Sequence, residues 1–213
     1  MNVQTITVGA FQENCYLLVD DRTNRAVIVD PGSEGERLVE AINRSGTELD
    51  AIWVTHAHVD HVGAIASIKR KWDVPIYLHP LERRLYDAAS RQAEVYGLPF
   101  EEPPAPDREF ADGQTVKVGD REMTVMHAPG HAPGHVVIHG DGIALVGDCL
   151  FAGSIGRTDL PFSNPPQLAA TLEKLAQLPP DTIVYPGHGV ETTIGEERLT
   201  NPFLNGTARI VGR

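Results

Sequence analysis

The 213-residue sequence predicts an α/β fold in which helices cover both faces of the sheets. Segments with strand and helix patterns alternate in both halves of the chain, which is typical of this class. Several predicted strands are short, continuous apolar runs, as expected for strands that are buried on both faces. We expect residues 1–213 to form a single domain.

In the first half of the chain, one helix is indicated by Val62, Ile65, Ile68 and Trp72, which recur at a spacing of three to four residues. The other expected elements are strands at Asn14–Val19, Ala26–Val29, Ala51–Val54 and Val74–Leu78, and helices at Glu34–Arg44 and Pro80–Gln92.

Residues 97–107 hold four of the chain's 16 prolines, so we expect a loop there that joins the two halves. The elements expected after this loop are strands at Thr115–Val118, Glu122–His127, Val136–His139, Ile143–Val146 and Thr182–Tyr185, and helices at Pro166–Gln177 and Ile194–Leu199.

Four apolar strands are each followed by a residue of a metal-ligating type. These residues are His56, His131, Asp148 and His188, and a glycine directly precedes each of the last three. Ligands at strand ends are held by a rigid sheet and still face an open cleft. Four such endings therefore predict one site.

The run His56-Ala57-His58-Val59-Asp60-His61 is the densest cluster of such residues. Imidazole and carboxylate groups together suit zinc, iron or manganese. We expect one cation to bind His56, His58 and His131, a second to bind Asp60, His61 and His188, and Asp148 to bridge the two. Three protein ligands per metal leave an open position, which is typical of a catalytic site.

The His56–His61 run resembles the motif of the metallo-β-lactamase fold superfamily, and residues 129–135, 147–151 and 186–189 resemble its later ligand motifs. Together with residues 11–16, these motifs resemble the glyoxalase II branch, the hydroxyacylglutathione hydrolases. Residues 153–159 and 200–204 resemble a short bacterial form of that branch.

This resemblance implies a four-layer αβ/βα sandwich with two divalent metal ions, most often zinc, although iron or manganese also fits. It implies hydrolysis of a glutathione thioester such as S-D-lactoylglutathione by a hydroxide that bridges the metals. Asp60 would be catalytic, because it would both bind metal and orient the hydroxide. Only a short segment follows His188, so the helical C-terminal domain that binds glutathione in longer enzymes is expected to be absent.

Other residues are weaker candidates. Asp30, in the turn after a strand, is expected either to form that turn or to orient a ligating histidine. Arg157 is expected either to bind a substrate carboxylate or to pair with Asp159. Candidates for the edge of the site are Glu13 and Asn14, and residues expected to be structural are His79, His127, His135, His139 and Cys149.

Three alternatives remain open. A persulfide dioxygenase of the same fold would use one iron at His58, His131 and Asp148. A lactonase, or less readily a β-lactamase, would use a similar set of ligands. The third alternative is a metal-binding scaffold without activity.

The net charge of −11 argues against partners such as nucleic acids or anionic membranes, and it implies that an anionic substrate would need a local cationic patch. A small-molecule substrate is therefore expected. There are only two cysteines and neither a signal-peptide pattern nor a long apolar run, so a cytoplasmic location is expected. The sequence leaves the oligomeric state open.

Overall fold

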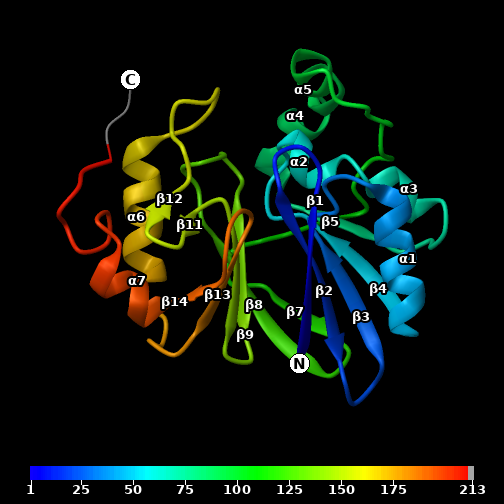
Figure 1. Ribbon diagram of the computed structural model, residues 1–213, viewed down its shortest axis with the longest axis horizontal. Helices are drawn as coiled ribbons and strands as arrows, with labels where there is room; N and C mark the ends of the chain where they lie inside the picture. Colours follow the sequence, from blue (N-terminus) through cyan, green and yellow to red (C-terminus); the bar gives the residue numbers. More distant parts are fainter. Residues whose placement is uncertain (211–213) are drawn as a thin grey trace.

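The computed structural model describes residues 1–210. Two six-stranded sheets face each other at the centre, and helices cover their outer faces (Figure 1). The layers therefore run helix, sheet, sheet, helix, which confirms the predicted α/β class. No helix in residues 1–210 has the length and apolar character of a membrane span.

The first sheet has the strand order β1-β2-β3-β4-β5-β6. Its first three strands pair antiparallel, and β3 to β6 pair parallel. The strands are β1 (Asn2–Val8), β2 (Glu13–Asp20), β3 (Arg25–Val29), β4 (Glu48–Trp53), β5 (Ile76–Leu78) and β6 (Arg108–Glu109).

The second sheet has the order β14-β13-β10-β9-β8-β7, in which β10 and β13 are parallel neighbours. Its strands are β7 (Thr115–Val118), β8 (Arg121–His127), β9 (Val136–Gly140), β10 (Ile143–Gly147), β13 (Ile183–Pro186) and β14 (Thr192–Thr193). A small hairpin of β11 (Leu150–Phe151) and β12 (Ser154–Ile155) follows β10.

Three apolar layers hold the four structural layers together, because successive strand residues point to opposite faces. In β2, for example, Leu17 packs toward α1 (Gly35–Ser45) and α3 (Ile65–Lys69), whereas Leu18 packs into the layer between the sheets. In β9, Val137 packs toward α6 (Pro165–Leu175) and α7 (Ile194–Thr200), while Val136 faces the first sheet.

Some elements differ from the sequence prediction. The expected helix 80–92 is a short 3-10 turn, η1 (Pro80–Glu82), followed by α4 (Arg83–Tyr86) and α5 (Ala89–Tyr96). The helix expected around Val62 is divided into α2 (Val59–Val62) and α3, because the backbone N–H of Ala64 donates to the carbonyl oxygen of Pro31 at 2.9 Å instead of continuing the helix.

Two further differences concern strands. Strand β1, an edge strand with few buried residues, has too weak an apolar pattern to be predicted, and the two-residue strands β6, β11, β12 and β14 are too short. The loop 97–107 is present, but it leads into β6 of the first sheet, so the chain passes to the second sheet only after that strand.

Candidate metal centre

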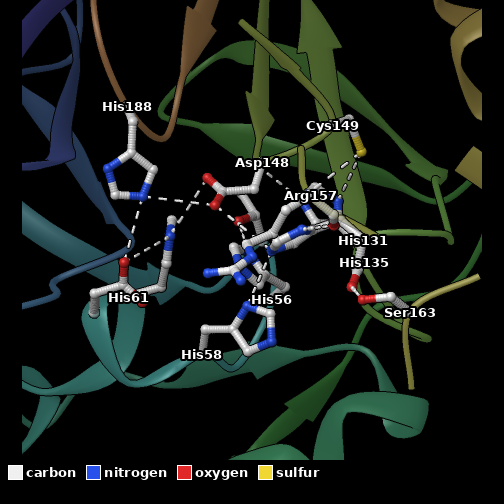
Figure 2. A network of polar contacts seen from close by, with 12 residues as sticks. His56, His58, His61, His131, His135, Asp148, Cys149, Arg157, Ser163 and His188 are labelled. Carbon is white, nitrogen blue, oxygen red and sulfur yellow. Dashed lines mark hydrogen bonds and ion pairs between the residues drawn. The ribbon is translucent and has the colours of Figure 1, made fainter. Parts of the chain in front are cut away.

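The structure brings all seven predicted ligands together at one edge of the facing sheets (Figure 2). They come from four loops, each of which follows a strand: the loop after β4 in the first sheet and the loops after β8, β10 and β13 in the second. The site is therefore built by both sheets. The residues are His56, His58, Asp60, His61, His131, Asp148 and His188.

Two of the four groups of neighbouring ligand-type side chains in residues 1–210 match the predicted division. His56, His58 and His131 form one and Asp60, His61 and His188 another, and one ligand atom from each residue lies within 4.8 Å of the others in its group. The other two groups are His56, His61 and Asp148, and Glu13, Asp30 and His61. In the first group, His131 Nε2 lies 3.0 Å from His58 Nδ1. In the second, His188 Nε2 lies 3.3 Å from Asp60 Oδ2.

Asp148 lies between the two groups (Figure 2). Its Oδ2 atom is 3.5 Å from His131 Nε2 and 3.5 Å from His188 Nε2, and its Oδ1 atom is 3.5 Å from His61 Nε2. This carboxylate therefore touches both groups, which is the position that the sequence predicted for a bridging ligand.

Hydrogen bonds to the far side of the rings fix which nitrogen faces the site. His131 Nδ1 lies 2.9 Å from the Arg157 carbonyl oxygen, and His188 Nδ1 lies 3.1 Å from that of Phe11. Because a carbonyl oxygen can only accept, each Nδ1 must donate, and in the neutral form of each ring Nε2 then presents its lone pair to the site. This is the second contact that metal-ligating histidines usually make.

Asp30 contacts the Nδ1 atom of His61, as the two carbonyl oxygens do for His131 and His188. Its Oδ2 atom lies 3.1 Å from His61 Nδ1, and both of its oxygens accept hydrogen bonds from Thr55, one from the backbone and one from the hydroxyl. Asp30 is buried and has a positive φ of 49°, so the turn and the contact with His61 occur together. Asp30 thus forms the turn and contacts His61, and the role of His61 as a metal ligand stays a prediction.

The electrostatics of the site fit cations. Burial lowers the pKa of His58 to about 3 and that of His131 to about 4, so both rings are neutral at pH 7 and can bind a metal. His58 Nδ1 and His131 Nε2 lie 3.0 Å apart, within hydrogen-bond distance, so a cation bound by both nitrogens would take the place of the proton between them.

Buried polar atoms without hydrogen-bond partners give a second test of whether these side chains suit metal ions. Within the described residues, His56 Nε2, His61 Nε2 and Asp148 Oδ1 are buried and make no hydrogen bond. Each such atom costs about 1–3 kcal/mol when it is left unpaired. All three belong to the predicted ligand set, and the other two such atoms in the described residues are the carboxylate oxygens of Glu13, behind His61. The unpaired donors of the predicted ligands therefore suit divalent ions.

Close packing against ligand side chains explains one of the glycines that precede the predicted ligands. A Cβ atom on Gly187 would lie 2.2 Å from Asp148 Oδ1. The loops after β10 and β13 can therefore bring Asp148 and His188 together only if residue 187 has no side chain.

The weaker candidates lie around the centre. Asn14 donates from its side chain to the carbonyl oxygens of Pro186 and Gly189, which holds the His188 loop. Glu13 is buried with both carboxylate oxygens unpaired within the described chain, and one of them lies 3.9 Å from His61 Nδ1.

The histidines predicted to be structural lie outside the ligand groups of the described residues. His135 accepts from the backbone N–H of Asp148 at 3.0 Å and stacks on His56, so it supports two of the predicted ligands. His127 stacks on His79, and Cys149 is buried against His135.

A cleft of about 900 Å³ opens above the centre. Its floor includes His58, Asp60, His131, Asp148 and His188, and its walls come from α4, α5 and the segment 154–162. Arg157 lines this cleft, but its guanidinium forms two hydrogen bonds of 2.7 and 2.8 Å with Asp159. The predicted ion pair is thus present, and the substrate contact stays a prediction.

Glu82 is a residue of the site that the sequence analysis missed. Its side chain is fully buried, and its two oxygens accept from the backbone N–H groups of Ala57 at 2.8 Å and Gly134 at 2.6 Å. Burial raises the pKa of Glu82 to about 7, against the lowering effect of these two donors. Glu82 therefore joins the His56–His61 loop of the first sheet to the His131 loop of the second.

Removal of metal should lower the stability of the protein. A ligand that binds only the folded state at 100 times its Kd adds about 2.7 kcal/mol, which corresponds to a decrease of about 5–10 °C in Tm for a chain of this size when it is removed. We expect calorimetry with and without a chelator to show this decrease, and re-addition of zinc or iron to reverse it. Equal Tm values would show that these side chains hold no ion.

Comparison with known proteins gives one family. The family model described as Metallo-beta-lactamase superfamily matches residues 8–188. The hydroxyacylglutathione hydrolase GloC of Haemophilus influenzae is 41% identical over 210 residues, which cover 96% of this chain and 99% of that protein. The probable metallo-hydrolase YqgX of Bacillus subtilis is 39% identical over 97% of this chain and 99% of its own length.

Solved structures agree in fold. The di-iron-bound form of TTHA1623 has a TM-score of 0.88 and 44% identity, covering 95% of this chain and all of that one. The BLEG-1 B3 metallo-beta-lactamase has a TM-score of 0.90 and 37% identity, covering 96% and 100%. ETHE1 from Myxococcus xanthus has a TM-score of 0.81 and 25% identity, covering 97% and 85%.

Proposed function

Because the chain belongs to the metallo-β-lactamase superfamily, we propose that it is a metallo-hydrolase with two divalent metal ions that cleaves a glutathione thioester such as S-D-lactoylglutathione. The observation that carries the proposal is the pair of ligand groups joined by Asp148. The similarity of this chain to GloC along almost its whole length supports the choice of a glutathione thioester. The di-iron form of TTHA1623 supports a pair of metal ions, which would be zinc or iron.

The seven predicted ligands would hold the two ions, with three side chains for each and Asp148 shared. When bound, divalent ions in this site would lower the pKa of a coordinated water and polarise the thioester carbonyl. The Nδ1 contacts of His131, His188 and His61 keep these rings oriented, so little reorganisation is needed during the reaction.

Asp60 has the geometry to orient the attacking water. It lines the cleft, and its Oδ2 atom lies 3.3 Å from His188 Nε2 and 3.9 Å from His61 Nε2. Its carboxylate can accept a hydrogen bond from the water and direct it toward a carbonyl bound in the cleft. A thiolate leaves readily near neutral pH, so the site does not require a strong general acid.

The persulfide dioxygenase alternative is weaker for a structural reason. It would use one iron at His58, His131 and Asp148, and the second group of Asp60, His61 and His188 would then have no ligand role. The similarity to ETHE1 is compatible with this alternative. The similarity to a B3 metallo-beta-lactamase is compatible with a hydrolase that acts on another substrate.

The test combines metal analysis with four assays on the purified, metal-loaded protein. We expect about two metal ions per chain, and release of glutathione from S-D-lactoylglutathione at a higher kcat/KM than for a lactone or a β-lactam. One iron per chain with oxygen consumption on glutathione persulfide would overturn the proposal in favour of the dioxygenase. Faster lactone or β-lactam cleavage would favour another hydrolase.

A further inference from the structure

The cleft above the metal centre has an unusual balance of charge. The chain has 29 acidic residues and a net charge of −11. Of the acidic residues that the structure describes, only Asp60 and Asp148 line the cleft, and both are predicted ligands that bound cations would neutralise. Three arginines, Arg84, Arg91 and Arg157, line the same cleft. An otherwise acidic protein therefore presents cationic groups where the substrate enters.

The three arginines differ in their partners. Arg157 is paired with Asp159. In residues 1–210, by contrast, no carboxylate pairs with the guanidinium of Arg84 or Arg91. Arg84 lies 4.4 Å from the centre of the Phe162 ring, a contact that leaves its in-plane N–H groups able to donate. Arg84 and Arg91 are therefore available to an anion.

The cleft also gathers exposed apolar side chains. Phe11, Val95, Tyr96 and Phe162 are each more than 40% exposed, and all four line it. Phe11 and Tyr96 pack edge to face with ring centres 5.2 Å apart. Exposed apolar side chains that collect in a concave surface are typical of a ligand-binding groove.

Both helices of the wall that carries the two arginines are joined to the loops of the predicted ligands. α4 directly follows Glu82, which binds the backbone of Ala57 and Gly134. The side-chain oxygen of Gln92 in α5 accepts from the backbone N–H of Val59 at 3.2 Å, within the His56–His61 run. A group bound by this wall is thus held at a defined position relative to the predicted ligands.

We propose that Arg84 and Arg91 form a carboxylate-binding subsite, which selects thioesters whose thiol portion carries a carboxylate over thioesters of neutral thiols. This inference rests on the proposed function. Glutathione has two carboxylates, and a guanidinium binds a carboxylate through two parallel hydrogen bonds. The subsite supplies the local cationic patch that an anionic substrate of an acidic protein requires.

The kinetic test uses two thioesters with the same acyl group, S-D-lactoylglutathione and the uncharged S-D-lactoyl-N-acetylcysteamine. For the metal-loaded protein, we expect Arg84→Gln and Arg91→Gln each to raise the KM for the glutathione thioester about tenfold, with little change in kcat. The preference for the anionic thioester over the neutral one should fall by the same factor.

Arg83→Gln is the matched control, because it removes the same charge from the neighbouring position. Arg83 is paired with Asp87 and does not line the cleft, so the KM values of the Arg83→Gln variant for both thioesters should equal those of the wild type. If the Arg84 and Arg91 variants behave like Arg83→Gln, or lose the same factor on both thioesters, the subsite is wrong while the hydrolase function stands.

A binding measurement separates the two proposals. Calorimetry with S-hexylglutathione, a thioether that cannot be hydrolysed, should show at least about tenfold weaker binding to Arg91→Gln and unchanged binding to Arg83→Gln. If the wild type hydrolyses neither thioester but the variants differ in binding as described, the proposed function fails and the subsite stands. Equal binding by all variants would overturn the subsite whatever the activity.

Discussion

Replacing Asp148 with asparagine should reduce thioester hydrolysis by about a thousandfold or more in kcat/KM, because it removes the charge that both metal positions share. The carboxylate lies 3.5 Å from imidazole nitrogens of both ligand groups. Asparagine has the same shape, so the fold should persist. Metal analysis of the variant should show fewer than two ions per chain.

Asp141→Asn is a suitable control for this variant. Asp141 also forms ion pairs, with Arg121 and the N-terminal amine, but it lies outside the cleft. Exposed pairs contribute about 0–1 kcal/mol, so activity and metal content should not change. An Asp148→Asn protein with two ions and the wild-type rate would show that this carboxylate is not a bridging ligand.

Replacing Glu82 with glutamine should weaken metal binding about 10- to 100-fold, the usual effect of removing a group that positions ligands. Glutamine has one side-chain oxygen, so it can accept from Ala57 or from Gly134 but not from both. One buried N–H then loses its partner, at a cost of about 1–3 kcal/mol in the free energy of unfolding. Metal titration and denaturant unfolding measure the two effects.

Glu197→Gln separates positioning from simple destabilisation. Glu197 is also buried, and it accepts from the backbone N–H of Gly153 and the side chains of Thr192 and Asn201, away from the predicted ligands. The variant should lose comparable stability and keep the metal affinity of the wild type. If both variants lose affinity equally, Glu82 acts only through stability.

Much of the fold could be predicted from the sequence because strand patterns and strand ends are local properties. The apolar run 51–54 and the histidines after it indicate a buried strand that leads into a ligand loop, and the structure has β4 there. The edge strand β1 was missed because only Ile6 and Val8 in it are buried, which leaves a weak apolar pattern.

Contacts between distant segments could not be predicted in this way. Glu82 follows Pro80 in a segment that has the pattern of a surface helix, and nothing local shows that its carboxylate is buried between two loops. The same holds for Arg84 and Arg91, whose place in the cleft depends on the break between α4 and α5. By contrast, the residue types of the seven predicted ligands were sufficient to group them, and the structure brings these seven side chains together.

The predicted metal ligands and the walls of the cleft lie in different segments of the chain, and this separation affects how such a protein can change its substrate. The seven predicted ligands lie just beyond strand ends, in loops and in the short helix α2, whereas α4, α5 and residues 154–162 contain none of them. Mutations in these wall segments can alter which molecules enter while the reactive centre and the three apolar layers stay in place. Catalytic chemistry and molecular selection can therefore diverge separately as relatives of this chain evolve.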